Sequence, residues 1–280
     1  MNTVNIIDMI KEGLRIARSA KSLWLFGFFV GLGSTFNSGG KSHAPPGTAH
    51  ALGSGMALLV AAAVAVMLAG VFLYFVSEGA LIEGVTRVQR GVPPSLRQGW
   101  RDGLSHWGVL CRLTLVFLAV LATSMALLGA PVLLAAKLSG SLLAVAVALP
   151  AALVAVTWLA TLYMWQQFAA RIAVLENRRA LDAIGKARLF LHGRLLHGLK
   201  LMIAALLGRL VVMAAGVAAI VVAGLLAFGL LAILGLTHAT VPVIVAGAVA
   251  VVPMALLLVA FSGTTQSSIW TAGYLRQAAQ

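Results

Sequence analysis

The sequence predicts an all-α, polytopic integral membrane protein, and three observations support that fold class. First, 61% of the 280 residues are hydrophobic and only 10% are charged, whereas about a quarter of the residues of a soluble domain are charged. Second, the apolar residues form long runs separated by short basic connectors. Third, the connectors carry apolar residues at the spacing of an amphipathic helix.

The net charge of +13 belongs mainly to these connectors. Lys and Arg residues that cluster between apolar runs set the orientation of a membrane protein, so we expect no nucleic-acid binding. The lone Cys111 lies inside an apolar run, which excludes an internal disulfide and disfavours a metal site. We therefore expect neither a metal nor another cofactor.

The chain begins with a predicted amphipathic helix over residues 3–21. Ile6, Ile10, Leu14 and Ala17 share one face of this helix at helical spacing. Basic residues occupy much of the remaining surface, so we expect the helix to lie at the membrane interface.

The first apolar run, at about 23–36, is interpreted as an uncleaved span. A hydrocarbon core of about 30 Å needs roughly 20 helical residues, so a tilted span, a thinned bilayer and a re-entrant path all remain open. Gly27 and Gly31 form a small-xxx-small pair. Close packing within the bundle is favoured over a dimer seam because such pairs are common. Residues 37–55 are predicted to form a loop.

Five further spans complete a predicted set of six within a single membrane domain, 1–280. Their predicted ranges are about 56–76, 107–135, 142–168, 201 to just before Gly235, and 241 onwards. An even number of spans places both termini on one side. The N-terminal helix and the two long basic connectors lie on that side, so the charge asymmetry predicts that both termini are cytoplasmic.

The connector between the second and third spans has the clearest local signals. Glu83 and Arg87 are spaced for a helical ion pair, and Pro93-Pro94 breaks the helix. Ser95 then reads as an N-cap. The interfacial helix that follows has an apolar stripe made of Leu96, Gly99, Trp100, Gly103, Leu104 and Trp107.

A basic amphipathic helix leads into a span at three places, which begin near Ile6, Ser95 and Ala180. The spacing predicts a three-fold internal repeat of helix hairpins, with units at about 1–91, 92–178 and 179–280. Each returning span also becomes polar near its cytoplasmic end.

Ionisable and amide side chains inside or beside the spans form a candidate polar cluster. Glu78 follows a long apolar run, and Arg209 lies within one; charged groups at such depth are by default functional hypotheses. Glu78 reaching the headgroups or pairing with Arg112 is the favoured structural alternative. The candidate cluster consists of Glu78, Arg112, Gln166, Gln167, Arg209, Thr265 and Gln266.

The basic connectors predict contacts with anionic lipid headgroups. The candidate cations are Arg15, Arg18, Lys21, Arg97, Arg101, Lys186, Arg188 and Arg194. No catalytic or metal-binding motif of the HExxH, GxSxG or P-loop type occurs in the sequence, so we expect a protein that is not an enzyme.

Three stretches carry a family resemblance: SLWLFGFF, the VSEGALIEGVTRVQRGVPPSLRQGWRDGL corner and the ARIAVLENRRALDAIGKA corner. They resemble a group of uncharacterised bacterial six-helix membrane proteins. That group is similar to the membrane domain that accompanies some glycerophosphodiester phosphodiesterases, but the catalytic domain is not present in this sequence. The resemblance implies a bacterial inner-membrane protein.

Two functional hypotheses follow from these observations. The first is a non-enzymatic scaffold or accessory subunit that acts through contacts with lipid, a protein partner or further copies of itself. The alternative is a transporter, channel or lipid-handling protein that uses the polar cluster around Glu78 and Arg209.

Overall fold

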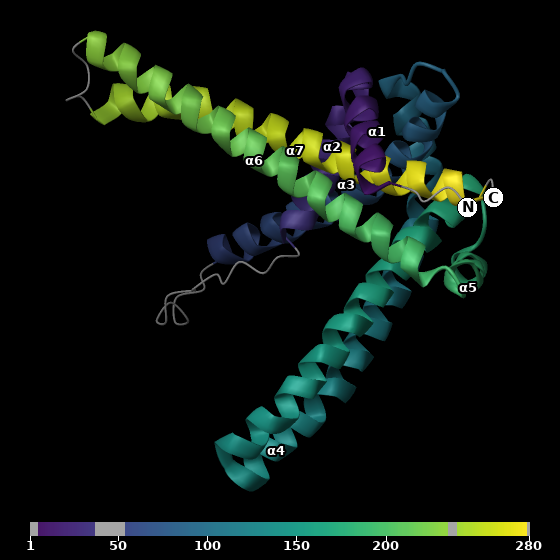
Figure 1. Cartoon of the computed structure of the whole chain (residues 1–280). Helices are drawn as coiled ribbons and strands as arrows, with labels where there is room; N and C mark the ends of the chain where they lie inside the picture. The colour runs from purple at the N-terminus through teal and green to yellow at the C-terminus, as the bar shows by residue number, and fades with distance from the viewer. Residues whose placement is uncertain (1–4, 37–53, 235–239, 279–280) are drawn as a thin grey trace. The chain divides into compact units, whose positions relative to one another are not determined.

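A computed structural model describes residues 5–36, 54–234 and 240–278, and the regular structure in these ranges is entirely helical (Figure 1). The all-α prediction is therefore confirmed for the described residues. The elements are α1 (Ile6–Ser19), a 3₁₀ turn η1 (Lys21–Leu23), α2 (Trp24–Phe36), α3 (Ser54–Gln89), α4 (Leu96–Leu175), α5 (Ala180–Leu191), α6 (Leu195–Ile233) and α7 (Thr240–Ala278).

Five helical stretches are long and apolar enough to cross a membrane. They are Leu58–Gln89, Leu96–Pro131, Ala146–Leu175, Leu195–Leu230 and Gly247–Ala278. The prediction of a multi-pass membrane protein is supported at this level. The predicted first span falls on α2, whose 13 residues extend only about 20 Å at 1.5 Å per residue, so the described helix is shorter than a hydrocarbon core.

Helix α4 contains two antiparallel legs. The rings of Phe117 and Trp165 lie 5.5 Å apart, whereas a straight helix between these positions would be on the order of 70 Å long. The helix must therefore turn back between them (Figure 1). The two legs correspond to the spans that the sequence predicts at 107–135 and 142–168.

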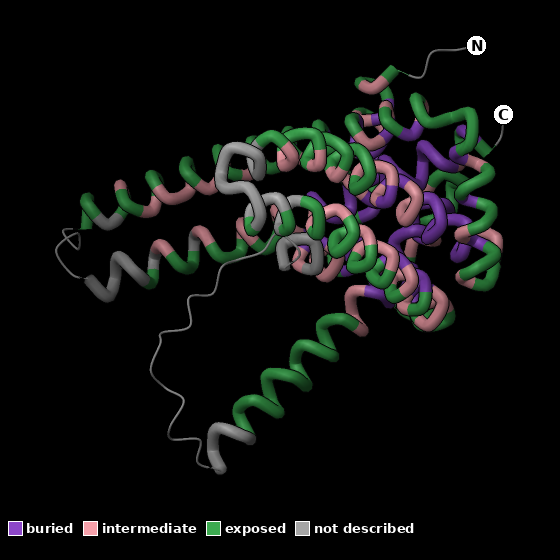
Figure 2. Tube along the Cα trace, turned by 90° about the horizontal axis from the view of Figure 1, so that it is seen from below, coloured by how far each residue is buried: buried purple, intermediate pink, exposed green. Residues whose placement is uncertain are grey.

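The described chain divides into two compact units. The first comprises Met1–Trp107 and Ile203–Gln280, and the second comprises Gly108–Met202. The core of the first unit lies where α1, α2, α3 and α7 meet, and Figure 2 shows buried positions gathered in these helices near the chain termini. Its main hydrophobic cluster contains Ile16, Ala20, Leu23, Phe26, Ala80, Leu81, Val85 and Ala272.

Helices α2 and α7 pack backbone to backbone in an antiparallel crossing. A Cβ atom added to Gly31 would lie 2.6 Å from the carbonyl oxygen of Val259, and one added to Gly27 would meet the carbonyl of Ala260. Gly263 of α7 faces the Gly27 carbonyl in the same way. The Gly27/Gly31 pair therefore serves packing within the bundle, as the sequence interpretation favoured.

The apolar face predicted for α1 is only partly buried. The residues of α1 that are buried are Met9, Gly13, Ile16 and Ala17, whereas Ile6, Ile10 and Leu14 are half-buried. Gly13 packs against the side chain of Ile269 on α7, and the absence of a side chain at this glycine allows a close approach of the two helices.

The amphipathic start of α4 divides its predicted stripe in the same way. Gly99 and Gly103 are buried, and a Cβ atom on Gly103 would meet the backbone of Val76 on α3. The large members of the stripe point outward and are exposed: Leu96, Trp100, Leu104 and Trp107. At the start of α4, two glycines thus face the bundle while the large apolar residues face its surroundings.

The second span of each predicted repeat unit, called here the returning helix, is the one that runs to the end of α3, α4 or α7. An ion pair joins the end of each returning helix to an amphipathic helix. In the first unit, Arg276 of α7 pairs with Glu12 of α1, and Arg87 of α3 pairs with Asp102 of α4 at 2.6 Å. Arg87 therefore has a partner other than the expected Glu83.

In the second unit, Glu176, just after α4, pairs with Lys186 of α5 at 2.6 Å. The end of α3 thus contacts the amphipathic start of α4, the end of α4 contacts α5, and the end of α7 contacts α1.

Candidate functional site

The candidate polar cluster is distributed over both structural units. Glu78, Arg209, Thr265 and Gln266 belong to the first unit, and Arg112, Gln166 and Gln167 belong to the second. The residues are therefore described below in two groups.

In the first unit, the polar end of α7 is an internal packing surface. Thr265 is fully buried, and its hydroxyl donates a hydrogen bond to the carbonyl of Phe261 at 2.8 Å. Thr264 is also buried and bonds to the Ala260 carbonyl at 2.9 Å. Such bonds to the preceding turn satisfy a hydroxyl inside a helix bundle. Glu78, Arg209 and Gln266 are half-buried at the margin of this region.

Four buried hydroxyl groups extend this polar region of the first unit. They are the side chains of Ser77, Ser267, Ser268 and Thr271, whose oxygens have no hydrogen-bond partner within the described residues. The cluster proposed from the sequence contained neighbouring residues of these four, namely Glu78 and Gln266, but none of the four hydroxyl groups themselves. The hydroxyl-rich sequence from Ser262 to Thr271 is the signal from which the three residues on α7 could have been found, whereas Ser77 follows a long apolar part of α3.

In the second unit, the structure adds Arg171, which sequence reasoning treated only as a connector cation. Its side chain is 2% exposed, and its Nη1 donates to the Gln167 carbonyl at 2.6 Å and to Gln167 Oε1 at 2.8 Å. Burying a guanidinium is costly unless its donors are satisfied, so Gln167 has a structural role. The four-residue spacing of these two side chains could have indicated the pair. Gln166 is half-buried and Arg112 is exposed.

All eight candidate lipid-contacting cations are exposed. Three of them belong to α1 and the following turn, two to the start of α4, and three to α5 and the turn after it. They are Arg15, Arg18, Lys21, Arg97, Arg101, Lys186, Arg188 and Arg194.

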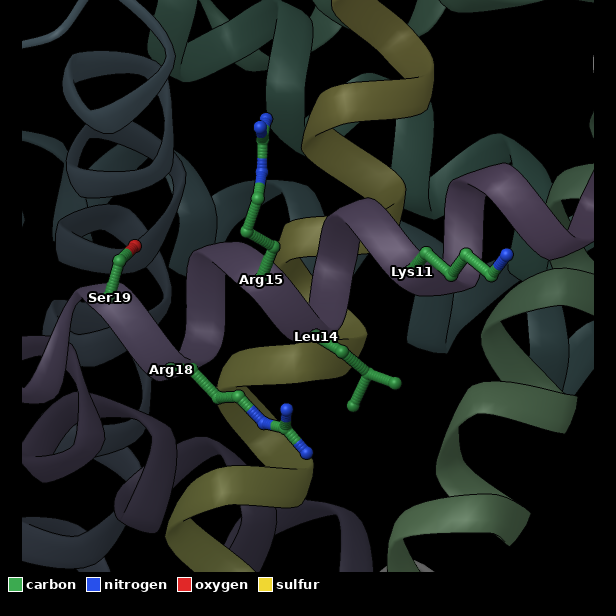
Figure 3. A pocket seen from close by; sticks show the side chains of 5 residues that line it. All are labelled: Lys11, Leu14, Arg15, Arg18 and Ser19. Carbon is green, nitrogen blue, oxygen red and sulfur yellow. The ribbon is translucent and has the colours of Figure 1, made fainter.

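A surface hollow of about 480 Å³ lies along α1 and is shown in Figure 3. In this view Leu14 and Arg18 extend to one side of the helix and Arg15 extends to the other. Within the described residues, no ion pair involves Lys11, Arg15 or Arg18. The remaining lining residue is Ser19, whose hydroxyl donates to the Ile16 carbonyl at 3.0 Å. This is an open, cationic surface beside an apolar side chain.

A second hollow, of about 370 Å³, lies on the returning leg of α4 and is mainly apolar. It is lined by Leu153, Val154, Thr157, Trp158 and Thr161. Both threonines donate to carbonyls of their own helix, Thr157 to Leu153 at 2.9 Å and Thr161 to Thr157 at 2.8 Å. These bonds satisfy both threonine hydroxyls within the helix, as a helix inside a bilayer requires.

The described residues contain no group of three or more His, Cys, Asp or Glu side chains arranged to hold a metal ion. Comparison with known protein families, characterised proteins and solved structures gave no match.

Proposed function

We propose that the protein is a non-enzymatic scaffold or accessory subunit of a bacterial inner membrane, and that it acts through protein and lipid contacts. One observation chiefly supports this proposal: within the most apolar stretches of the five candidate spans, only 6% to 24% of the residues are buried. Lipid or the helices of other molecules must cover the remaining apolar surface, because exposing it to water is unfavourable.

Anionic lipid is part of the proposal. Each well-placed cation near an anionic leaflet contributes about 1 kcal/mol of attraction, and the eight exposed cations lie on the connectors beside the candidate spans. This attraction holds the connectors at the headgroups while the apolar helices contact other molecules.

We place both termini in the cytoplasm, with six crossings. The Arg276–Glu12 ion pair and the hydrogen bond from Gln89 to Glu12 at 3.4 Å bring together α1 and the ends of α3 and α7. Because α3 is itself long enough to span, the chain between α1 and the start of α3 has to reach the opposite side. The cationic connectors favour the cytoplasm for the shared end.

The three-fold repeat is part of the same proposal. The cyclic order of the three junctions supports it, since each returning helix pairs with the amphipathic helix of the next unit. The middle unit differs in one respect: its amphipathic helix continues into α4 without a break, whereas turns separate α1 from α2 and α5 from α6. Membership of the six-helix bacterial group that the sequence resembles also remains a proposal.

The decisive experiment is extraction from native membranes in polymer nanodiscs, followed by quantification of every co-purifying protein and lipid. The proposal expects a protein partner, or further copies of the chain, at fixed stoichiometry. A monomer accompanied only by bulk lipid would contradict the scaffold function. A cytoplasmic-membrane protein of similar abundance, extracted in parallel, corrects for non-specific capture.

A second candidate function, transport or lipid handling, rests on two half-buried charged residues, Glu78 and Arg209, and on the buried hydroxyls of α7 in the same structural unit. Glu78→Gln and Arg209→Leu should then abolish solute flux or lipid transfer in proteoliposomes while insertion is retained. Arg112→Gln is the matched control, because Arg112 is exposed. Unchanged flux in the first two variants would assign these side chains a structural role.

A further inference from the structure

Helix α5 packs against the returning leg of α4 at the point where that leg stops being apolar. The indole nitrogen of Trp165 donates to the Ile184 carbonyl at 2.9 Å, and the rings of Phe168 and Phe190 lie 5.3 Å apart. Trp165 precedes Gln166 and Gln167, and Trp marks membrane interfaces. These contacts therefore indicate that α5 lies at the level of the interface.

The inner face of α5 contains two alanines and Leu191, and the outer face carries two exposed leucines. Ala183 and Ala187 are completely buried. On the opposite side, Leu181 and Leu189 are 71% and 76% exposed. Gly185, which lies between them, has nothing within 4 Å of an added Cβ atom. Fully burying a leucine in an apolar phase is worth about 2 kcal/mol, so this stripe has a strong tendency to leave water.

Cations border the stripe. Arg188 flanks it on one side and Lys186 on the other, with the exposed carboxylate of Asp182 between Lys186 and the stripe, and Arg194 follows in the turn before α6. Arg188 is exposed, Lys186 pairs with Glu176, and the Arg194 guanidinium lies 5.5 Å from the ring centre of Phe190. The first turn of α6 then adds exposed Leu195 and Leu196.

We propose that the outer face of α5 is a membrane anchor that inserts Leu181 and Leu189 into an anionic leaflet, where Arg188 and Arg194 bind phospholipid phosphates. A leucine stripe bordered by cations matches the acyl chains and charged surface of such a leaflet. The interfacial level of α5 brings the stripe to the depth at which acyl chains begin. This inference rests on the proposed membrane location and assigns a lipid partner to one defined surface.

Fluorescence quenching tests the anchor in purified protein. A Cys111→Ser background carries a single environment-sensitive probe at Leu181→Cys or Leu189→Cys, in nanodiscs of phosphatidylcholine with or without equal parts of phosphatidylglycerol. Brominated acyl chains report lipid contact, and iodide reports contact with water. Leu153→Cys on the apolar leg is the lipid-exposed reference, and Arg178→Cys in the polar turn is the reference for water.

The anchor predicts that both α5 probes are quenched by brominated lipid about twofold more than the probe at position 178, with low iodide quenching. Arg188→Gln with Arg194→Gln should reduce quenching of the Leu189→Cys probe in discs that contain phosphatidylglycerol and leave it unchanged in pure phosphatidylcholine.

Three outcomes would overturn the proposal. Iodide quenching without lipid quenching would show that the stripe faces water. Shielding from both quenchers would show that protein, such as a second copy of the chain, covers it. Both results leave the membrane location intact if Leu153→Cys is quenched by lipid, whereas a Leu153→Cys probe that is also unquenched would contradict the membrane location itself.

Discussion

Glycines decide how closely the helices of the first unit approach one another. Gly27 and Gly31 of α2 face backbone carbonyls of α7, so a methyl group at either position would meet atoms that cannot move without shifting a whole helix. Gly70 of α3, by contrast, has nothing within 4 Å of an added Cβ atom. The four-residue spacing of the first pair is visible in the sequence, and Gly99 and Gly103, which share that spacing, are also buried.

We predict that Gly27→Ala lowers the free energy of unfolding by about 3 kcal/mol through overpacking. Gly70→Ala should instead leave stability unchanged or raise it by up to about 1 kcal/mol, because alanine is the better helix former. Reversible unfolding in mixed detergent micelles measures both. Equal effects of the two substitutions would contradict the backbone contact between α2 and α7.

A second prediction concerns the pair of Glu12 and Arg276. The side chain of Arg276 is 43% exposed, so solvent screens the pair and we expect a small, measurable coupling free energy of about 0.5 kcal/mol. A double-mutant cycle with Glu12→Gln and Arg276→Gln measures it. The same cycle on Arg97 and Glu12, for which the structure shows no ion pair, should give zero coupling; a zero for the Arg276 cycle as well would contradict the junction.

At the scale of elements, helix type and position could be predicted from the sequence, and the orientation of faces could not. Apolar runs and the Pro93-Pro94 break located the long helices well. Glycine and alanine are prominent in the inward faces of α1, the start of α4 and α5, although Met9, Ile16 and Leu191 are buried there too. A hydrophobicity pattern weights glycine and alanine less than leucine or tryptophan, so it does not show which side of such a helix packs closely against a neighbour, where small residues are needed.

The first apolar segment provides the third prediction. If the chain crosses the membrane before α3, a cysteine at His43, which lies outside the described residues, should react with an impermeant maleimide from the periplasmic side in a Cys111→Ser background. A cysteine at the exposed Arg90 should react only after the cytoplasmic side is opened. Labelling of the position 43 cysteine from the cytoplasmic side alone would show a re-entrant path and would leave five crossings.

At the scale of the whole molecule, membership of the membrane class followed from composition, whereas the candidate polar cluster stays a prediction. Its seven members fall in two structural units, and the most deeply buried cation, Arg171, was outside it. The position of a residue along an apolar helix does not show whether its side chain points into the bundle or away from it. The three junction ion pairs could not be predicted either, since their partners come from different elements.

The cyclic order of these junctions leads to a fourth prediction. A circular permutant that begins at Val92 and joins the original termini with a flexible linker should insert and keep its thermal stability to within a few degrees, because α1 and the end of α7 already meet. The control permutant begins at Gly185 inside α5, which interrupts a helix. Equal loss of stability in both permutants would contradict a repeat boundary near residue 92.

Native mass spectrometry of nanodisc-extracted protein tests the scaffold function most directly, because it reports the stoichiometry of the intact particle. One chain has a mass of 29.0 kDa, and the account predicts a discrete larger species, either a fixed multiple of this mass or a fixed complex with a partner. A Leu225→Ala and Leu226→Ala variant, which trims exposed apolar surface of α6, should weaken that species. A population of single chains carrying only lipid, unchanged by these substitutions, would contradict the account.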